Sequence, residues 1–399
     1  MKDSPWKQEI DKLRLLGLYR TMPSIAGLPG RTITVNGKEV INFSGNNYLG
    51  LAGHPRVVQA SAEAAQLYGA GSTASRLIAG NTEMHRELEA FIAAWKGTEA
   101  AVVFGSGYQA NVGILSALAD KEDLIISDQY NHASIIDGCR LSRAKVMTYP
   151  HLDCDKMEDF LKLDGFRRKL VVTESVFSMD GDTAPLKRID ELCKRWGAVL
   201  MVDEAHATGV MGPQGQGLAA EVGIVPEIQM GTLGKALGSA GAYVAGSRAL
   251  VQFIVNKSRS LIYTTAGPPG VIGASLAALK IVASQEGQSR RDRLNENARL
   301  FSELLRREVG CDGDSSHIVP IVIGDSRRAM EVSEACLAGG VFAHGIRYPT
   351  VPEGSARLRF TLMSDHTAED LNKAVAVLSA AINGVRSNVE MRVAASKHG

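Results

Sequence analysis

Short apolar segments alternate with helix-like segments through the middle of the chain. Residues 100–104, 123–126, 169–173, 198–202 and 228–230 are apolar along nearly their whole length. Strands buried on both faces of a sheet have this character, and the helical segments between them give a βαβ rhythm. The pattern predicts an α/β fold with a mostly parallel central sheet flanked by helices.

The two ends of the chain have different patterns. Apolar residues at helical spacing predict a helix over residues 6–19, and alternation over residues 32–43 predicts a hairpin turning at Asn36-Gly37, a dipeptide typical of type I′ turns. A second helix is expected over residues 55–68, followed by a run of small residues, 69–76, that suits a site or a tight interface. Strands over residues 318–323, 341–346 and 356–362 and a helix over 368–382 predict a smaller second domain.

Composition narrows the class of protein. A chain of 399 residues, 45% hydrophobic and 22% charged, can bury a large core. We expect an N-terminal helix and hairpin segment (residues 1–50), a large cofactor-binding domain (51–290) and a small C-terminal α/β domain (291–399). A net charge of +1 without long runs of one sign gives no reason to expect nucleic acid or a membrane as a partner, so the expected ligands are small molecules.

The cysteines and the N-terminus bear on the compartment. Five scattered cysteines without CxxC spacing argue against a disulfide framework and against a zinc or other metal site. The first twenty residues are charged throughout, and no run of about 18 apolar residues occurs. These features predict a cytoplasmic protein.

Polar residues follow each of the five predicted strands. Because the carboxyl ends of parallel strands meet at one edge of a sheet, these residues are expected to face one pocket. The clusters are Gly105-Ser106-Gly107-Tyr108-Gln109-Ala110-Asn111, Asn131-His132, Thr173-Glu174-Ser175-Val176-Phe177-Ser178, Asp203-Glu204-Ala205-His206 and Thr232-Leu233-Gly234-Lys235-Ala236-Leu237-Gly238.

Lys235 is the candidate attachment point for an aldehyde cofactor. A lysine amine becomes nucleophilic when its pKa is lowered, and Gly234 and Gly238 would let a bulky cofactor approach the backbone. Taken alone, a lysine between glycines is more often a surface residue in a flexible turn. A Walker loop is excluded, because Gln229 and Ala236 stand where that motif needs Gly and Ser or Thr. The polar clusters at the other strand ends favour the cofactor site.

Each of the other clusters suits one part of pyridoxal phosphate. Gly107 at a helix start and the Thr232 hydroxyl can bind the phosphate, and His132 can stack on a planar ring. Asp203 can pair with a protonated pyridine nitrogen, and His206 follows three residues later. Taken singly, these residues suit blander roles: a strand-to-helix turn, a core or surface histidine, and a helix cap or metal pair.

Taken together, the motifs resemble the α-oxoamine synthases, which are fold-type I pyridoxal-phosphate enzymes. The resemblance covers residues 6–385, with the motifs in family order. It implies a fold-type I PLP-dependent transferase that joins an amino acid to an acyl thioester, with pyridoxal 5'-phosphate as cofactor. The motifs are Asn46-Asn47-Tyr48-Leu49-Gly50-Leu51, Ser106-Gly107-Tyr108, Asn131-His132-Ala133-Ser134, Phe177-Ser178-Met179-Asp180-Gly181-Asp182, Asp203-Glu204-Ala205-His206, Thr232-Leu233-Gly234-Lys235 and Tyr348-Pro349-Thr350-Val351-Pro352.

The resemblance also implies roles for single residues. Lys235 would hold the cofactor and later remove the α-proton, while Asp203 keeps the ring nitrogen protonated; either His132 or His206 would act on the acyl carbonyl. Arg359 would bind the amino acid's carboxylate, and its neighbour Arg357 better suits a surface salt bridge on an edge strand. The implied cofactor contacts are Gly107, Tyr108, His132, Glu174, Ser178, Asp203, His206, Thr232, Lys235, Thr264 and Thr265, and the implied substrate contacts are Arg20, Asn46, Thr350 and Arg359.

Within the family, residues 75–77, 203–206, 261–265 and 349–352 most resemble the branch that condenses L-alanine with pimeloyl-CoA or its carrier-protein thioester in biotin synthesis. Residues 131–144 and 232–237 resemble equally the branch that uses glycine and acetyl-CoA, and a third branch uses serine and a palmitoyl thioester. Arg20 matches the position that meets the acyl substrate, although a helix-end arginine also explains it.

Two further expectations concern assembly and activity. The family resemblance implies a homodimer in which Thr264 and Thr265 reach the phosphate of the partner's site. A catalytically silent scaffolding subunit is the alternative from a different class, and the presence of Lys235 argues against it.

Overall fold

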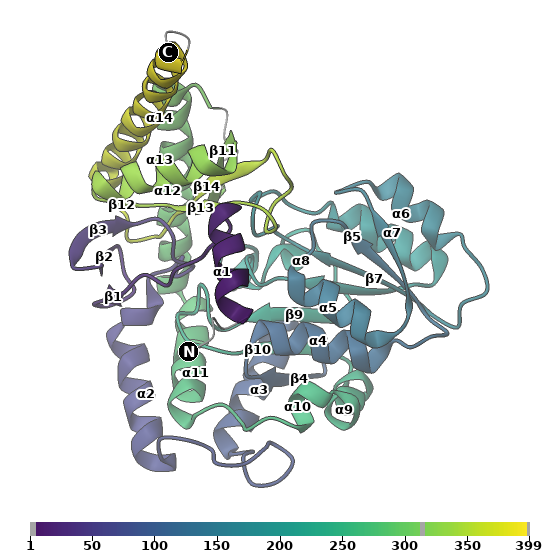
Figure 1. Ribbon diagram of the computed structural model, residues 1–399. Helices are drawn as coiled ribbons and strands as arrows, with labels where there is room; N and C mark the ends of the chain where they lie inside the picture. The colour runs from purple at the N-terminus through teal and green to yellow at the C-terminus, as the bar shows by residue number, and fades with distance from the viewer. Residues whose placement is uncertain (1–4, 312–315, 397–399) are drawn as a thin grey trace. The chain divides into compact units, whose positions relative to one another are not determined.

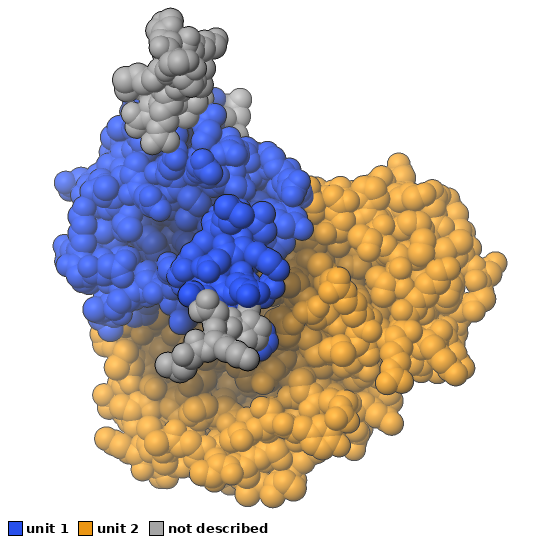
Figure 2. Space-filling model, viewed as in Figure 1, with its two compact units in different colours: residues 1–45, 179–181, 294–399 blue, residues 46–178, 182–293 orange. Residues whose placement is uncertain are grey.

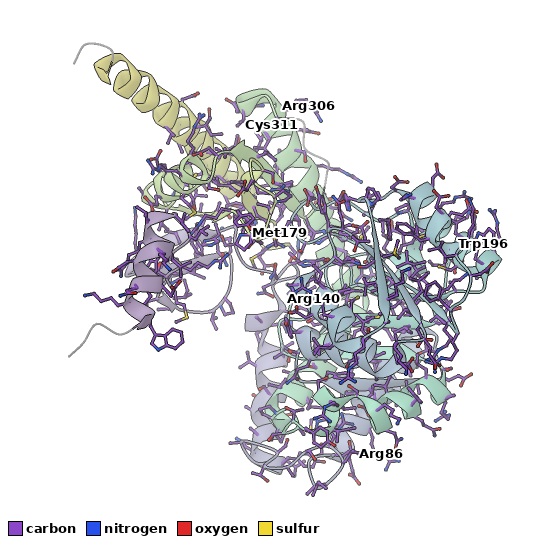
Figure 3. All side chains as sticks on the ribbon, turned by 45° about the vertical axis from the view of Figure 1, so that its right-hand side comes forward. Arg86, Arg140, Met179, Trp196, Arg306 and Cys311 are labelled. Atoms are coloured by element: carbon purple, nitrogen blue, oxygen red, sulfur yellow. The ribbon has the colours of Figure 1, made fainter. Side chains whose placement is uncertain are left out.

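The computed structural model describes residues 5–311 and 316–396. The contacts of the chain divide it into two compact units, coloured separately in Figure 2: unit 1 holds residues 1–45, 179–181 and 294–399, and unit 2 holds residues 46–178 and 182–293. The short segment of unit 1 that begins at Met179 is marked in Figure 3. The division of the chain at residues 50 and 290 stays a prediction.

Unit 2, all of whose residues are described, is built on a seven-stranded sheet with the order β4-β10-β9-β8-β7-β5-β6 (Figure 1). Neighbouring strands from β6 to β9 run parallel, whereas β10 runs antiparallel to both β9 and β4. The predicted mostly parallel sheet is therefore confirmed. The strands are β4 (Ala100–Phe104), β5 (Leu124–Asp128), β6 (Lys145–Tyr149), β7 (Lys169–Glu174), β8 (Val199–Asp203), β9 (Ile228–Thr232) and β10 (Ala242–Gly246).

The sequence pattern did not indicate two of these strands. In the edge strand β6 only the last residue, Tyr149, is buried, so the strand lacks a continuous apolar run. Strand β10 is buried along its whole length, but alanine and glycine supply most of its residues and give it little β-signal.

Helices of unit 2 connect and cover these strands. They are η1 (Leu51–Gly53), α2 (Pro55–Tyr68), α3 (Glu83–Lys96), α4 (Gly107–Leu118), α5 (Ala133–Ser142), α6 (Cys154–Leu161), α7 (Leu186–Trp196), η2 (Pro213–Gly215), α8 (Leu218–Glu221), α9 (Arg248–Lys257), α10 (Arg259–Ile262) and α11 (Pro269–Val282), and α12 (Gln285–Val309) crosses from unit 2 into unit 1.

Both faces of the seven-stranded sheet are buried. Alternate strand residues such as Phe104 and Val172 join one apolar cluster with residues of α4, α5 and α9. The intervening residues Val103 and Val171 point to the opposite face and are buried as well. By the same alternation, Glu174 of β7 and Asp203 of β8 lie on the face that packs against α4 and α5.

Unit 1 contains the predicted hairpin. Strands β2 (Thr32–Val35) and β3 (Lys38–Asn42) are antiparallel, and Asn36 and Gly37 between them have φ of 49° and 84°, as a type I′ turn requires. Strands β1 (Ile25–Ala26) and β12 (Val341–Phe342) complete a four-stranded sheet among the described residues. The N-terminal helix α1 (Pro5–Leu15) is shorter than predicted, since Gly17 adopts φ of 67°.

The C-terminal part of unit 1 differs from the prediction at one strand. The segment predicted as a single strand over residues 341–346 forms two short strands, because β12 pairs with β3 whereas β13 (His344–Ile346) pairs with β14 (Ala356–Thr361). In the described residues, β11 (Ile318–Gly324) joins β14 and β13 in a three-stranded sheet. The helices are α13 (Ser326–Ala338) and α14 (Ala368–Ser396), which extends beyond the predicted residue 382. No helix within the described ranges is long and apolar enough to cross a bilayer.

Candidate active site

Lys235 lies in a tight turn between β9 and β10 of unit 2. The turn is closed by a hydrogen bond from the backbone N–H of Gly238 to the Lys235 carbonyl. Gly238 has φ of 64°, and a Cβ at this position would lie 2.2 Å from the backbone nitrogen of Ala52. Only glycine fits at position 238, so the turn packs directly against the backbone of Ala52. Lys235 is half-buried, and its Nζ lies 2.7 Å from His206 Nε2.

A chain of hydrogen bonds leads from Lys235 to the Asn46 loop. Tyr48 Oη donates to Asn46 Oδ1 at 3.0 Å and lies 2.7 Å from His206 Nδ1. Tyr48 uses its only proton in the hydrogen bond to Asn46, so in the contact with His206 the tyrosine oxygen accepts and His206 Nδ1 donates. His206 Nε2 then has no proton, and its lone pair faces Lys235. Asn46 and His206 were predicted site residues, whereas the role of Tyr48, which is fully buried, was not predicted.

Asp203 is a buried carboxylate at the end of β8. Its Oδ1 accepts a hydrogen bond from the Ala205 N–H, and its Oδ2 accepts one from Asn111 Nδ2 on α4, both at 2.8 Å. Within residues 5–311 and 316–396, no lysine or arginine forms a salt bridge with Asp203. A buried carboxylate held only by neutral donors suits a cationic ligand.

Glu174 lies beside Asp203, because the register of β7 and β8 pairs the two residues directly. Burial and the charge of Asp203 raise the pKa of Glu174 to about 8, against the influence of Lys235 and of hydrogen bonds from the backbone N–H groups of His132 and Ser178. Glu174 Oε1 is buried and has no hydrogen-bond partner in the described part of the chain. The sequence motifs pointed to Glu174 but gave no sign of this raised pKa.

His132 begins helix α5 at the same edge of the sheet. Its Nδ1 lies 2.8 Å from Ser134 Oγ and accepts a hydrogen bond from the Ser134 N–H. The ring is exposed, yet desolvation by the surrounding chain and the positive charge of Lys235 lower the pKa of His132, against the opposing effect of Asp203. The preceding Asn131 is buried and links β5 to β7 through Ser127 Oγ and the Val172 carbonyl.

The candidate phosphate contacts are distributed over three segments of unit 2. Ser106 caps helix α4 by accepting a hydrogen bond from the Gln109 N–H, so Gly107 stands in the first turn of that helix. Thr232 Oγ1 donates to the Gly241 carbonyl, and Ser178 is buried after β7. Tyr108 is exposed and donates to Asp137.

Thr264 and Thr265 lie between α10 and α11. Thr265 forms an isolated antiparallel bridge with Ser75, in the run of small residues noted in the sequence. Thr264 is half-buried and Thr265 is exposed. Their predicted contact with a partner's phosphate stays a prediction.

Three of the expected substrate residues belong to unit 1. Arg20 and Thr350 are exposed, and Arg359 is buried on β14. Arg357 does form a salt bridge, with Asp180, and it also donates to the Met179 carbonyl. The expectation was wrong in two respects, because β14 is the central strand of its described sheet and Arg357 is buried.

Arg347 is a basic residue of unit 1 that sequence analysis missed. It is buried, and its guanidinium donates to the Tyr19 carbonyl at 2.7 Å and contacts the Met330 sulfur, with no carboxylate partner in the described residues. Burial and the nearby charge of Arg20 lower the pKa of Arg347. Arg347 directly precedes the family motif Tyr348-Pro349-Thr350, and this position was the one sequence feature that could have marked it as a site residue.

The residues present in unit 2 fit pyridoxal phosphate. The lysine amine stands near a buried carboxylate without a cation, and two buried acceptors, Glu174 Oε1 and Asn111 Oδ1, have no partner within the described chain. A metal is a poorer match: among the residues searched, none group as three or more His, Cys, Asp or Glu side chains able to hold one.

Comparisons with known proteins agree with this chemistry. The family model "Aminotransferase class I and II" matches residues 38–378. An 8-amino-7-oxononanoate synthase from Geobacter sulfurreducens is 48% identical over 376 residues, which cover 93% of this chain and 96% of that relative. A solved structure of SPT with PLP aligns with a TM-score of 0.90 and 31% identity, covering 96% of this chain and 98% of that one. The crystal structure of an 8-amino-7-oxononanoate synthase from Francisella tularensis aligns with a TM-score of 0.74 and 31% identity, covering 86% and 98%.

Proposed function

The chain belongs to the α-oxoamine synthases within the class I and II aminotransferase family, and we propose that it condenses L-alanine with a pimeloyl thioester, releasing CO₂, to form 8-amino-7-oxononanoate. The observation that carries this substrate choice is the 48% identity, over more than nine tenths of the chain, to relatives named 8-amino-7-oxononanoate synthase. The predicted fold-type I architecture, the PLP dependence and the acyltransferase activity are confirmed. Glycine with acetyl-CoA and serine with a palmitoyl thioester are the competing substrate pairs.

When bound, pyridoxal 5'-phosphate supplies a conjugated ring that takes up the negative charge developing at the substrate Cα. Lys235 would hold the cofactor covalently, and Asp203 would hold the proton on its ring nitrogen. Asn111 and the Ala205 N–H fix the Asp203 carboxylate for this task. Gly107, Tyr108, His132, Ser178 and Thr232 are the proposed contacts along the rest of the cofactor.

Proton transfer at Cα falls to the Lys235–His206 pair. Lys235 Nζ removes the α-proton, and the His206 Nε2 lone pair 2.7 Å away can accept a proton from the resulting ammonium group. Tyr48 keeps His206 in the tautomer that makes this possible, since it receives the Nδ1 proton. His132, the other candidate, is then available to orient the ring and the acyl carbonyl.

Glu174 limits the negative charge of the site. Two adjacent carboxylates cannot both be ionised in a buried setting without a large cost, and Glu174 is the one that takes the proton. A neutral Glu174 lets Asp203 keep its full charge for the ring nitrogen. Its unpartnered Oε1 remains available to the cofactor.

Two buried arginines of unit 1 are candidates for the amino acid's carboxylate. Arg359 is the residue that the family resemblance implies, and Arg347 is a second candidate because its guanidinium lacks an acidic partner in the described residues. Arg20, Asn46 and Thr350 are proposed to contact the substrates, with Arg20 facing the far carboxylate of the pimeloyl chain.

We further propose a homodimer in the cytoplasm. Leu77, Ile78 and Tyr263 are large apolar residues of unit 2 that are 51%, 82% and 72% exposed, and they flank the Ser75–Thr265 bridge. A second copy of the chain would cover them and receive Thr264 and Thr265. All five cysteines are free, as suits a reducing compartment. Sedimentation showing a fully active monomer would contradict the dimer.

A substrate panel tests the proposed function. L-alanine, glycine and serine are each offered with acetyl, pimeloyl and palmitoyl thioesters, and CO₂ and amino-ketone products are measured. We expect alanine with pimeloyl thioester to give the highest kcat/KM, and supplying it on CoA and on carrier protein separates those two donors. Preference for glycine with acetyl-CoA, or for serine with palmitoyl-CoA, would refute the proposal.

Arg20 provides the matched variant for the same panel. Arg20→Ala should raise KM for pimeloyl thioester while leaving KM for heptanoyl thioester, which has no far carboxylate, nearly unchanged. An equal change for both acyl chains would remove Arg20 from the acyl site without affecting the assignment of the reaction.

A further inference from the structure

A histidine outside the cofactor contacts links three loops at the carboxyl edge of the sheet in unit 2. His151 Nδ1 lies 2.9 Å from Asp128 Oδ1, and His151 Nε2 lies 2.8 Å from Asp182 Oδ2. Asp128 ends β5, His151 follows β6, and Asp182 lies in the loop after β7. One side chain therefore joins the ends of three strands.

The geometry favours a cation. Ionised carboxylates only accept hydrogen bonds, so both ring nitrogens of His151 must donate, which is possible only for the imidazolium. Burial opposes this charge, but the hydrogen bonds and charges of Asp128 and Asp182 outweigh it and raise the pKa of His151 to about 9. Asp182 Oδ1 is buried without a hydrogen-bond partner in the described chain, so this carboxylate depends on His151 for compensation.

Aromatic rings enclose the imidazolium. The Tyr130 ring stacks on it at 4.4 Å between centroids, and the Phe177 ring meets it edge-on at 4.4 Å. Tyr149 and Cys154 also lie near Asp128, but burial raises the pKa of each, so both are neutral at pH 7. Asp128 and Asp182 are thus the charged groups that face His151.

The same cluster fixes the segments that carry two proposed cofactor contacts. Asp128 accepts hydrogen bonds from the backbone N–H groups of Tyr130 at 2.8 Å and Leu152 at 2.9 Å, and Leu152 adopts a φ of 62° that is costly for leucine. Tyr130 stands two residues before His132. Phe177 stands directly before Ser178, and its N–H donates to the Asp182 carbonyl at 3.0 Å.

We propose that His151 is a positioning residue: as a cation between Asp128 and Asp182, it locks the segments bearing His132 and Ser178 in the arrangement that retains pyridoxal phosphate. The proposal rests on the PLP dependence within the proposed function and is independent of the choice of amino acid or thioester. It implies that loss of the His151 proton at high pH loosens the hold on the cofactor.

The test measures how fast the holoenzyme releases its cofactor. Bound-cofactor absorbance is followed between pH 7.5 and 10 with a phosphatase present to remove free pyridoxal phosphate. The variant is His151→Gln, and the matched control is His54→Gln, which breaks a histidine–carboxylate pair with Glu286 of 2.9 Å elsewhere in unit 2. We expect His151→Gln to release cofactor about tenfold faster or more at pH 7.5, because hydrogen bonds to charged groups are lost.

The pH profile separates positioning from general stability. Release from the unaltered enzyme should accelerate with a midpoint near pH 9, and this transition should be absent in His151→Gln and retained in His54→Gln. Unchanged release in His151→Gln, or the same pH transition in both, would overturn the proposal. If His151→Gln does not fold, Asp182→Asn takes its place. Release should again be faster at pH 7.5, and the transition should move to lower pH because His151 keeps only Asp128 as a partner. Unchanged release together with an unmoved transition would overturn the proposal. An enzyme that retains cofactor normally but forms no 8-amino-7-oxononanoate would refute the proposed reaction alone.

Discussion

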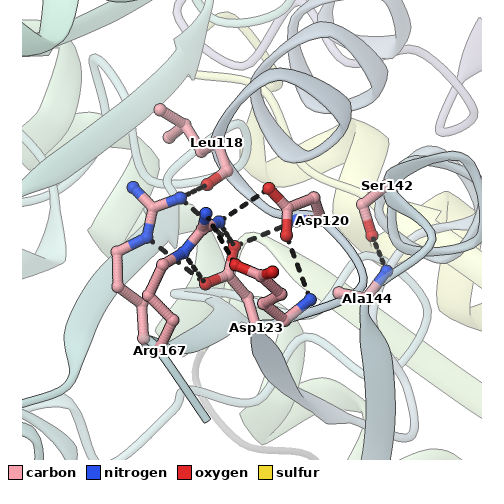
Figure 4. Close-up of polar contacts among 8 residues, drawn as sticks. Leu118, Asp120, Asp123, Ser142, Ala144 and Arg167 are labelled. Carbon is pink, nitrogen blue, oxygen red and sulfur yellow. Dashed lines mark hydrogen bonds and ion pairs between the residues drawn. The ribbon is translucent and has the colours of Figure 1, made fainter.

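Buried carboxylates have opposite surroundings at the two ends of the parallel strands in unit 2. The amino ends of these strands are called the amino edge, and their carboxyl ends the carboxyl edge. At the amino edge, Asp123 is bound by Arg167 and Arg168, with N–O distances of 2.6 and 3.2 Å (Figure 4). Burial disfavours its charge, but these hydrogen bonds and one from the Asp120 N–H outweigh that effect and lower the pKa of Asp123 to about 2. At the carboxyl edge, no arginine or lysine of the described chain forms a salt bridge with Asp203, and burial raises the pKa of Glu174 to about 8.

A cavity alone does not explain the difference. The amino edge has a hollow of about 420 Å³, lined by apolar residues such as Leu170 and Ile228 together with Asp123 and Arg168. Its polar groups are already satisfied: Glu227, for example, accepts a hydrogen bond from the Leu200 N–H. The carboxyl edge instead holds buried acceptors without partners in the described chain. Unmet hydrogen-bonding capacity, more than volume, marks the edge that is proposed to bind the cofactor.

The largest effect should come from Lys235→Ala. We expect turnover to fall by about 10³-fold or more, since general base catalysis alone contributes about 10²–10⁴-fold and the covalent anchor is lost as well. Borohydride reduction followed by peptide mapping should label Lys235 in the unaltered enzyme and no residue in the variant. The control is Lys280→Ala, which removes an exposed lysine paired with Glu87. A label on another lysine would contradict the assignment.

Asp203→Asn should have the next largest effect. We expect turnover to fall by about 10²-fold or more while the fold and part of the cofactor are retained, because a neutral amide cannot hold the proton on the ring nitrogen. Steady-state kinetics and cofactor absorbance measure the two outcomes. Asp120→Asn, which neutralises an exposed carboxylate at the amino edge, should leave both unchanged. Near-normal turnover of Asp203→Asn would remove this residue from the mechanism.

Glu174→Gln should act mainly through pH. The folded pKa of about 8 lies above the ordinary value of 4.5, so between these two pH values the folded apo-protein binds a proton that the unfolded chain has lost. The free energy of unfolding therefore falls as the pH rises from about 4.5 to 8. Glutamine cannot titrate, so the variant should lose this dependence and gain stability relative to the unaltered chain across that interval. Thermal melting of both apo-proteins between pH 5 and 8 is the measurement. Parallel curves would show that Glu174 is ionised.

The smallest effect should come from Asp123→Asn at the amino edge. Its side chain is only 2% exposed and its pKa is depressed, so we expect the variant to lose about 1–2 kcal/mol of unfolding free energy at pH 7. This loss should shrink as the pH falls from about 4 to about 2, where the native carboxylate is also protonated. Denaturant titration checks both statements. Cofactor retention should be unchanged, and a large loss of cofactor would break the contrast between the edges.

The sequence predicted those features that depend on local pattern. The apolar runs identified five strands of the central sheet, and Asn36-Gly37 identified the hairpin turn. Strand β6 was missed because its residues are mostly exposed, and the break between β12 and β13 was missed because it depends on two different partner strands. Apolar runs and turn dipeptides are properties of adjacent residues, whereas the pairing of a strand depends on residues that are distant in sequence.

The same limit applies to the site. Strand ends and family motifs led to Lys235, Asp203 and His206, and all three meet at one edge of the sheet in unit 2. The role of Tyr48 and the protonation of Glu174 depend on distances between segments that lie far apart in the chain. No pattern in a single segment contains that information.

Because Glu174 pairs with Asp203 across β7 and β8, cofactor binding also depends on the correct register of these two strands. A slip of one residue in this register would turn Asp203 to the opposite face of the sheet, away from Asn111 and α4. Such a molecule could still be compact and rich in β-structure, yet it could not bind the cofactor. The yellow colour of bound cofactor that returns after refolding should therefore measure only the chains with the correct strand register. Circular dichroism reports β-structure and cannot distinguish these chains from the rest.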